Sequence, residues 1–276
     1  MATDTKTFLI TGSTDGVGRR VAERLAGPES TVLVHGRDRK RGTETVRTIL
    51  KAGGNAVFYP ADLSVLSDVY QLAAAVRREH PRIDVLINNA GIGVVGAYSG
   101  RCESQDGFEL RFAVNYLSGF FLTRLLLPAI KNSGNSRIIN VSSAGQQPID
   151  FTDIMLKKRY SGRHAYCQSK LAQILFTFDL ARELSDTGIT VNVLHPATFM
   201  ATGMVYGDGI TPSANVDEGA DAILHLALSP ALQGQSGLYF DGVRTSHAHA
   251  QAYDADARQK LRNLSFKRKR PEQDVE

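Results

Sequence analysis

The chain has 276 residues, of which 42% are hydrophobic and 22% are charged, and it contains two cysteines. These proportions are typical of a globular protein with a sizeable core, and they exclude collagen, a coiled coil and a disulfide-stapled scaffold. The formal net charge is +4, and the four basic residues at 267–270 carry the whole excess. We therefore expect no nucleic-acid partner, one domain over residues 1–264 and a basic, solvated C-terminal tail over residues 265–276.

No targeting or membrane segment is expected. The first predicted strand begins near Thr7, which leaves no room for a signal peptide. The longest apolar stretch, residues 119–130, is interrupted by Thr123, Arg124 and Pro128 and is too short to span a bilayer. Two cysteines without zinc-ligand spacing fit a reducing compartment, so we expect a cytoplasmic protein that contacts no membrane and holds no metal.

Short apolar runs alternate with helical patterns along the chain. The predicted strands cover residues 7–11, 31–35, 55–60, 83–88, 138–142, 189–194 and 237–240. The predicted helices cover residues 16–26, 38–52, 64–80, 106–132, 163–187 and 216–228, and Ser64 is expected to cap the third. Strands with continuous Val, Ile and Leu runs that are separated by helices form a parallel sheet covered on both faces. The sequence therefore predicts an α/β protein with a single doubly wound Rossmann-type domain and a parallel sheet of about seven strands.

Three glycines follow the first predicted strand, where ligands bind in doubly wound sheets. Gly12 permits a tight turn, and Gly16 and Gly18 let backbone amides and a helix N-terminus approach a pyrophosphate. The spacing Gly-x3-Gly-x-Gly differs from the Gly-x-Gly-x-x-Gly fingerprint, and a simple turn is the alternative. As a binding loop, the segment places these residues at a cofactor: Gly12, Ser13, Thr14, Asp15, Gly16, Val17 and Gly18.

The end of the second predicted strand indicates which dinucleotide binds. NAD sites usually place an acidic residue here, whereas Arg37 can pair bidentately with the 2′-phosphate of NADP(H). A solvated helix start is the alternative, and the acidic Asp38 is one residue away. We expect NADP(H) as the preferred cofactor and NAD(H) as the less favoured one.

Two further segments at strand ends are expected to face the adenosine. Asp62 and Leu63 follow the third strand, where an adenine ring would lie. Small residues after the fourth strand let the backbone pass close to the ribose, and Asn88 at its end is expected to tie neighbouring strands together. The residues expected at the ribose are Asn89, Ala90 and Gly91.

Tyr166 and Lys170 form the strongest chemical pair. Their i, i+4 spacing places both side chains on one face of the predicted helix. An isolated phenol titrates near pH ~10, and a nearby ammonium group favours the phenolate and brings the phenol toward working pH. A lone pair of this kind is often only a surface contact. This one follows the fifth strand and the serines Ser142 and Ser143, a position that favours catalysis.

With its motifs in this order, the chain resembles the short-chain dehydrogenase/reductase family over about residues 7–245, and most resembles the retinol dehydrogenase branch. The shared elements are Thr11-Gly12-x3-Gly16-x-Gly18, Asp62-Leu63, Asn88-Asn89-Ala90-Gly91, Asn115, Asn140-Val141-Ser142-Ser143 and Tyr166-x3-Lys170. The branch is indicated by Arg159-Tyr160-Ser161, by Ala165-Tyr166-Cys167 and by the long interval between Ser143 and Tyr166.

The resemblance implies a role for each catalytic residue. Tyr166 donates or accepts the proton, and Lys170 lowers the Tyr166 pKa and holds the nicotinamide ribose. Ser143 bonds the substrate oxygen, and Asn115 helps to order a proton-relay water. These roles fit the physics, because hydride transfer builds charge on a carbonyl oxygen that hydroxyl donors stabilise.

The resemblance also carries expectations for the nicotinamide loop and for assembly. The backbone of Pro196 and Thr198 is expected to contact the carboxamide, although Ala197 stands where the family often has glycine. Retinol-active relatives commonly carry an N-terminal membrane anchor, and none is expected here. Family members pair through two long helices, here residues 106–132 and 163–187, so a homodimer or homotetramer is expected.

The substrate side is expected to be apolar. The insertion that follows Ser143 supplies Phe151 and Met155, and the loop after the sixth strand supplies Phe199 and Met204. Packing of these side chains on the core is the alternative. We predict an NADP(H)-dependent oxidoreductase that interconverts a hydrophobic ketone or aldehyde and its alcohol by hydride transfer. Reduction of an activated C=C bond and a non-catalytic NADP(H)-binding sensor or scaffold are the alternative functions.

Overall fold

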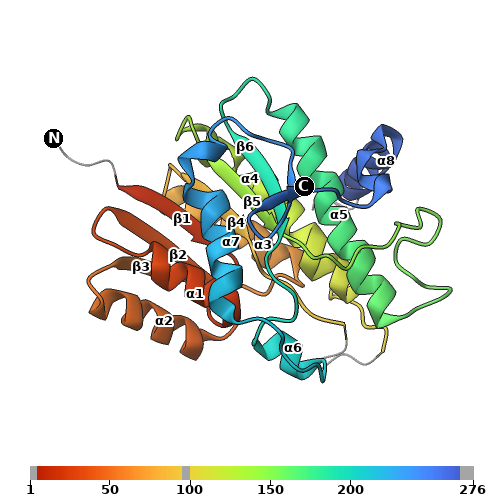
Figure 1. Ribbon diagram of the computed structural model, residues 1–276, viewed down its shortest axis with the longest axis horizontal. Coiled ribbons are helices and arrows are strands. Elements are labelled where there is room, and N and C mark those ends of the chain that lie inside the picture. Colours follow the sequence, from red (N-terminus) through yellow and green to blue (C-terminus); the bar gives the residue numbers. More distant parts are fainter. Residues whose placement is uncertain (1–4, 95–99, 268–276) are drawn as a thin grey trace, which may run out of the picture.

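The computed structural model describes residues 5–94 and 100–267, and these residues form one α/β domain around an eight-stranded sheet (Figure 1). The strand order is β3-β2-β1-β4-β5-β6-β7-β8; the first seven strands are parallel and β8 pairs antiparallel with β7. The strands are β1 Lys6–Ile10, β2 Ser30–Gly36, β3 Asn55–Pro60, β4 Val85–Asn88, β5 Arg137–Val141, β6 Thr190–His195, β7 Tyr239–Asp241 and β8 Arg244–Ser246. The predicted doubly wound fold is confirmed, with one short edge strand beyond the seven expected.

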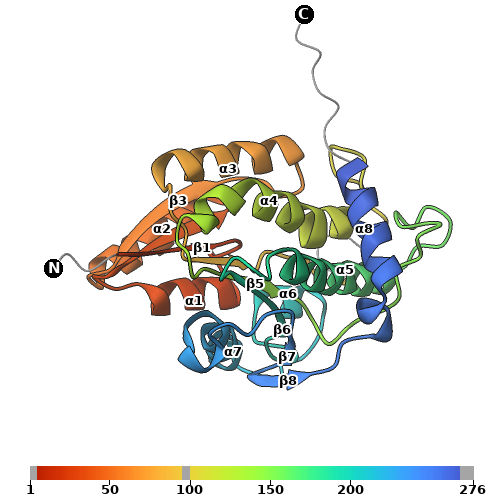
Figure 2. The same cartoon turned by 90° about the horizontal axis from the view of Figure 1, so that it is seen from above.

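Helices cover both faces of the sheet (Figure 2). One layer contains α3, α4 and α5, and the other contains α1, α2 and α7. The helices are α1 Gly16–Leu25, α2 Arg39–Lys51, α3 Leu66–Glu79, α4 Ser118–Lys131, α5 Gly162–Glu183, α6 Gly203–Gly207, α7 Val216–Leu228 and α8 Ala255–Lys267. A π-helical turn, Phe112–Leu117, precedes α4, and short 3-10 turns lie at Pro230–Leu232 and Ala250–Tyr253.

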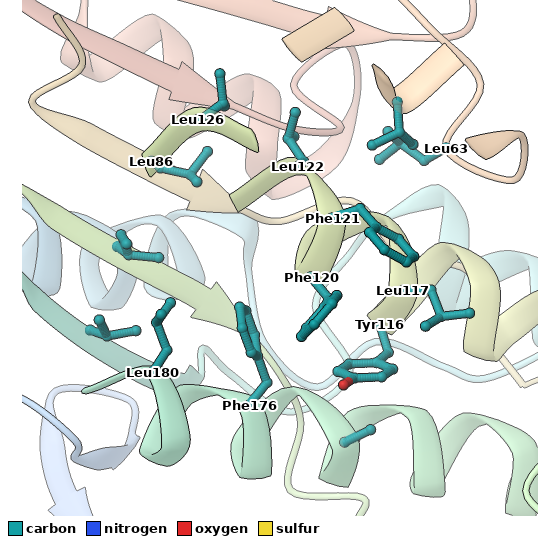
Figure 3. Packing of buried hydrophobic residues seen from close by; sticks show 14 of the residues in the cluster. Leu63, Leu86, Tyr116, Leu117, Phe120, Phe121, Leu122, Leu126, Phe176 and Leu180 are labelled. Atoms are coloured by element: carbon teal, nitrogen blue, oxygen red, sulfur yellow. The ribbon is translucent and has the colours of Figure 1, made fainter. Parts of the chain in front are cut away.

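The larger core lies between the sheet and the layer of α3, α4 and α5 (Figure 3). Phe120 and Phe176 pack with their ring centroids 5.2 Å apart, and Tyr116 lies against Phe112 at 5.0 Å. Aromatic pairs at these separations contribute about 0.5–1.5 kcal/mol each beyond the area that they bury. The packing fixes α4 and α5 relative to each other, and α5 carries Tyr166 and Lys170.

Two expected helix starts are wrong. Ser64 does not cap α3: its hydroxyl donates to Asp62 Oδ1 at 2.8 Å, and the Leu66 amide donates instead to Asp106 Oδ2 at 2.8 Å. Asp106 lies 40 residues along the chain, so sequence-local capping rules could not find it. The helix predicted from residue 106 therefore begins later. Asp106 lies in the turn before it, and its carboxylate caps the N-terminus of α3.

The helix α8 was not predicted, and it extends past the expected domain end at residue 264. Ser265 is buried and shares a hydrogen bond of 2.7 Å with the Tyr116 hydroxyl, so the first part of the expected tail, residues 265–267, belongs to the domain. The remaining tail, 268–276, lies outside the described residues. The Phe266 ring lies 5.3 Å from that of Phe120, and Arg262 pairs with Asp179 at 3.3 Å. The helix α8 thus covers part of the α4 and α5 surface through which pairing was expected (Figure 2).

Within the described ranges, one helical stretch, Phe112–Lys131, is long and apolar enough to cross a membrane by length and composition. Of its most apolar window, 67% is buried inside the fold. This burial is the property of a core helix, because α4 packs between α3, α5 and the sheet.

Candidate active site

A cavity of about 840 Å³ opens at the carboxyl ends of the parallel strands. This volume lies within the roughly 300–1,000 Å³ of small-molecule sites, and the position is where doubly wound sheets bind ligands. Most of the predicted site residues line it. They are Gly12, Thr14, Asp15, Gly16, Val17, Gly18, Arg37, Asp62, Leu63, Asn89, Ala90, Gly91, Ser143, Tyr166, Lys170, Pro196, Thr198, Phe199 and Met204.

The glycine loop is built so that backbone alone faces the cavity. Gly12 has a φ of 66°, and a Cβ there would lie 2.9 Å from the Ala90 Cα. A Cβ at Gly18 would lie 2.3 Å from the Gly12 carbonyl oxygen and 2.4 Å from the Asn89 Nδ2. Asn89 donates from this nitrogen to Thr11 O at 2.9 Å and so holds the loop in place. The loop and the α1 N-terminus therefore fit the pyrophosphate of a dinucleotide.

Ser13 and His35 support the loop from behind. Ser13 is fully buried and does not line the cavity; its hydroxyl donates to Ile10 O at 2.8 Å and accepts from the His35 amide at 3.0 Å. The Gly12 amide donates to His35 Nδ1 at 3.1 Å. Burial lowers the pKa of His35 to about 4, so the ring is neutral and can accept this bond at pH 7. Ser13 is thus a structural residue of the loop, and sequence reasoning missed His35.

Three charged residues, Asp15, Arg37 and Asp62, line the cavity near the ends of β1, β2 and β3, and Arg41 pairs with one of them. Arg37 is 57% exposed at its side chain, and its Nη1 lies 3.7 Å from Asp62 Oδ2. Arg41, from the first turn of α2, pairs with Asp15 at 2.9 Å. These pairs are exposed and contribute little to stability. The Arg37 guanidinium thus lies at the cavity wall near the ends of β2 and β3.

Tyr166, Ser143 and Lys170 lie together on the opposite wall, on α5 and just after β5. Burial raises the pKa of the Tyr166 phenol, and its hydrogen bond with Ser143 opposes that rise. Lys170 Nζ lies 5.7 Å from the Tyr166 ring centroid and donates to Val141 O at 3.0 Å. Burial lowers the Lys170 pKa to about 8. Burial, Ser143, Cys167 and Asp208 account for the direction of the Tyr166 shift, and the lowering of the Tyr166 pKa by Lys170 stays a prediction.

Asn115 lies in the π-helical turn, and this position explains its contacts. Single π turns inside α-helices are frequent at functional sites. Asn115 Oδ1 accepts from the Ile92 amide at 2.8 Å, and Nδ2 donates to Ser169 Oγ at 3.0 Å. The side chain stands behind the cavity wall: a Cβ on Gly91 would lie 3.3 Å from Asn115 Oδ1 and 3.4 Å from Lys170 Nζ. Asn115 therefore ties the segment after β4 to α5 beside Lys170.

Asn88 behaves as the sequence indicated, and His195 is a further polar residue at a strand end. Asn88 Nδ2 donates to Asn140 Oδ1 at 2.9 Å, which ties β4 to β5. His195 is the last residue of β6, and its Nε2 shares a hydrogen bond of 3.0 Å with Thr198 Oγ1. Burial lowers the His195 pKa, so this ring is a neutral part of the cavity wall.

The substrate side is only partly where the sequence placed it. Phe199 and Met204, 47% and 38% exposed, line the cavity from the segment after β6. Phe151 and Met155 instead pack on the hydrophobic core, and Met155 is 5% exposed. The prediction that these two side chains contact substrate is wrong. The insertion folds back onto the domain, where Gln168 Nε2 donates to Ile154 O at 2.8 Å. The alternative of core packing holds for these two residues.

The fold and the site define a dinucleotide-dependent oxidoreductase that acts on CH–OH and C=O groups. Residues 6–209 match the short chain dehydrogenase family. The chain belongs to this family, as its motifs predicted.

Curated relatives agree with the branch that the motifs indicated. Mouse retinol dehydrogenase 14 is 36% identical, and the match covers 94% of this chain and 84% of that protein. Human retinol dehydrogenase 13 is 34% identical over 93% of this chain and 82% of that protein. Among solved structures, the landomycin C-6 ketoreductase LanV with bound NADP and rabelomycin has a TM-score of 0.68 and 28% identity, over 87% of this chain and 96% of that one.

Proposed function

We propose that the chain is an NADP(H)-dependent oxidoreductase that interconverts a hydrophobic ketone or aldehyde and its alcohol. The observation that carries the proposal is that Ser143, Tyr166 and Lys170 share one cavity with the glycine loop. When bound there, the nicotinamide supplies or accepts the hydride. The chain itself supplies binding groups, a proton and stabilisation of charge.

The preference for NADP(H) is supported by the arginine at the end of β2. Arg37 is exposed at the cavity wall beside Asp62, where its guanidinium can form charge-assisted bonds with a 2′-phosphate. No acidic residue occupies that position, and Asp38 instead caps α2 by accepting from the Arg41 amide at 3.0 Å. The bound NADP in the related ketoreductase LanV agrees with this choice.

Proton transfer is assigned to Tyr166. Because burial raises its pKa, the phenol is protonated at neutral pH and can donate to a carbonyl oxygen as negative charge develops on it. Ser143, which is hydrogen-bonded to Tyr166, gives a second hydroxyl donor at the same oxygen. In the reverse direction the phenol must first lose its proton, so alcohol oxidation requires a higher pH than ketone reduction.

A hydrophobic substrate is supported by the cavity wall and by the relatives. Phe199, Met204 and Val205 line the cavity from one side, and Leu110 and Val114 line it from the helix that begins before α4. The relatives are retinol dehydrogenases and a ketoreductase whose structure holds rabelomycin. We further propose a cytoplasmic homodimer or homotetramer without membrane contact; the free thiols Cys102 and Cys167 fit a reducing compartment.

The test is NADPH consumption against ketones, aldehydes and enones, with Arg37→Ala beside the wild type. Loss of a charge-assisted bond of roughly 1.5–3 kcal/mol should lower kcat/KM for NADPH about ten- to hundredfold and leave that for NADH unchanged. Arg39→Ala, an exposed residue of the same segment that does not line the cavity, is the matched control. Equal wild-type use of both cofactors would contradict the preference. Turnover of enones alone would favour C=C reduction, and tight NADPH binding without turnover would favour a sensor.

A further inference from the structure

The dipeptide Gly93-Val94 lies at the substrate end of the cavity and is held from one side by a buried arginine. The Arg111 side chain is fully buried, and it donates to Gly93 O at 2.8 Å and to Val94 O at 2.5 Å. It also donates to the Tyr160 hydroxyl at 2.6 Å. Tyr160 directly precedes Ser161, the N-cap of α5. The two carbonyl groups are therefore fixed relative to the helix that carries Tyr166.

From the other side, the dipeptide is contacted by the lid segment, defined here as residues 198–213. Asp208, which follows α6, accepts from the Val94 amide through Oδ2 at 2.9 Å. A Cβ on Gly93 would lie 2.5 Å from Asp208 Oδ2 and 2.9 Å from Met204 Cγ, so a side chain there would force the lid segment away. The Asp208 side chain is half-buried and lines the cavity.

We propose that Asp208 is a positioning and specificity-determining residue, which holds the lid segment on Gly93-Val94 and selects neutral over anionic carbonyl substrates. This inference rests on the proposed function. Because Arg111 fixes the carbonyl groups of the dipeptide, the Val94 amide is a preorganised donor for the carboxylate. The carboxylate then stands at a wall shared with Ile92, Leu110 and other apolar groups, where charges are poorly screened. A substrate carboxylate at this end would meet a like charge.

Asp208 also influences the ionisation of Tyr166, which gives a second measurable effect of its charge. Burial is the main reason for the raised pKa of Tyr166, and the Asp208 carboxylate and Cys167 add to the rise. Ser143 opposes it, and Lys170 Nζ lies 5.7 Å from the ring. Removing the Asp208 charge should therefore let the phenol ionise at lower pH. A residue that only stabilised the fold would leave the pH profile unchanged.

The cavity is also lined by the cationic residues Arg37, Lys170 and Arg163, and Arg163 is the one that could oppose the selection by Asp208. Arg163, in the first turn of α5, is exposed, lines the cavity and is hydrogen-bonded to Cys167. If Arg163 dominated recognition, the enzyme would prefer anionic substrates, which is the opposite outcome. We expect Asp208 to dominate, because it is the less exposed of the two and is fixed by the Val94 amide.

The experiment compares methyl 4-acetylbenzoate with 4-acetylbenzoate, two ketones of similar shape that differ in charge. The wild type should prefer the ester, and Asp208→Asn should lower the ester-to-acid ratio of kcat/KM about tenfold, the scale of one partly screened like-charge contact. Asp208→Asn should also shift the pH profile of alcohol oxidation to lower pH. Asp208→Ala, which loses the Val94 contact as well, should raise KM for both ketones.

Tyr206→Ala is the matched control, because Tyr206 lies on α6, is 62% exposed and does not line the cavity. Binding of both ketones to the NADP⁺-loaded protein is also measured by calorimetry, which needs no turnover and so separates this inference from the proposed function. Melting temperature and NADPH affinity report whether each variant is folded. A wild-type preference for the acid, or an unchanged ratio in a folded Asp208→Asn variant, would overturn the inference.

Discussion

Replacing Lys170 by methionine is expected to abolish turnover and to increase the stability of the fold at pH 7. Lys170 is 4% exposed, and burial lowers the pKa of its ammonium group from the ordinary 10.5 to about 8. A fall of this size corresponds to roughly 3 kcal/mol, at about 1.4 kcal/mol per pH unit, and it opposes folding while the group is charged. Methionine has an unbranched, flexible chain without a charge to desolvate.

The loss of one hydrogen bond partly offsets this gain in stability. Lys170 Nζ donates to Val141 O at 3.0 Å, and removal of that bond costs about 1 kcal/mol. We therefore expect Lys170→Met to be more stable by roughly 1–3 kcal/mol in urea unfolding at pH 7. For a domain of this size each kcal/mol corresponds to about 2–4 °C in Tm. Lys131→Met, at the exposed end of α4, is the control, and its effect should stay within about 0.5 kcal/mol.

The pH dependence of this difference tests the cause. Lysine in the unfolded chain titrates near 10.5 and Lys170 in the fold at about 8, so between these values the unfolded chain binds more protons. The Lys170 contribution therefore makes the wild type more stable as pH rises through this window, and the advantage of Lys170→Met is largest below pH 8. A variant that is less stable at pH 7, or a difference that stays constant up to about pH 10, would refute the desolvation argument.

The remaining predictions concern the proton donor, the glycine loop and the assembly. Tyr166→Phe should lower kcat at least about a thousandfold and leave NADPH affinity within a few-fold, and retention of most activity would reject its role. Gly18→Ala should weaken NADPH binding at least about tenfold and destabilise the fold by about 1–3 kcal/mol, because the new Cβ would lie 2.3 Å from a carbonyl oxygen. Gly100→Ala, whose Cβ would have no atom of the described residues within 4 Å, should do neither. If two subunits pair through the α4 and α5 surface, the interface includes α8. Phe266→Glu should then convert dimers to monomers, as measured by light scattering. A monomeric wild type would exclude that interface.

The sequence predicted the parallel sheet because most of its strands are rich in apolar residues, whereas the polar strand β8, Arg244–Ser246, gave no such signal. It also predicted most residues of the cavity wall, since the carboxyl ends of parallel strands meet at one edge of the sheet. Local rules failed where a contact came from far along the chain. Asp106 caps α3 from 40 residues away, and α8 depends on contacts such as Arg262 with Asp179. The buried face of α8 is short and consists of Ala257, Leu261 and Ser265, of which only Leu261 is a large apolar residue, so its apolar pattern is a weak signal in the sequence.

The errors at the site have the same origin. Phe151 and Met155 were expected at the substrate because an apolar insertion follows Ser143, but apolar character alone does not distinguish a ligand pocket from core packing. The sequence did not identify Arg111 or Asp208 as site residues, although each stands out. Arg111 is a charged residue at the start of an otherwise apolar stretch, and Asp208 is an acidic residue in the lid segment. Only the structure shows that both contact the same dipeptide.

Residues that lower the stability of the fold are concentrated at the proposed active site. Lys170 is a buried cation whose pKa is lowered, Asn115 lies in a π turn, and Phe199 adopts a φ of 47° in the lid segment. Each feature is unfavourable by itself, by amounts on the order of 1–3 kcal/mol, and persists only because the surrounding packing outweighs it. The aromatic core between α4 and α5 supplies that packing directly behind the site. A stabilised variant of this enzyme is therefore most easily made at Lys170, and it would be inactive.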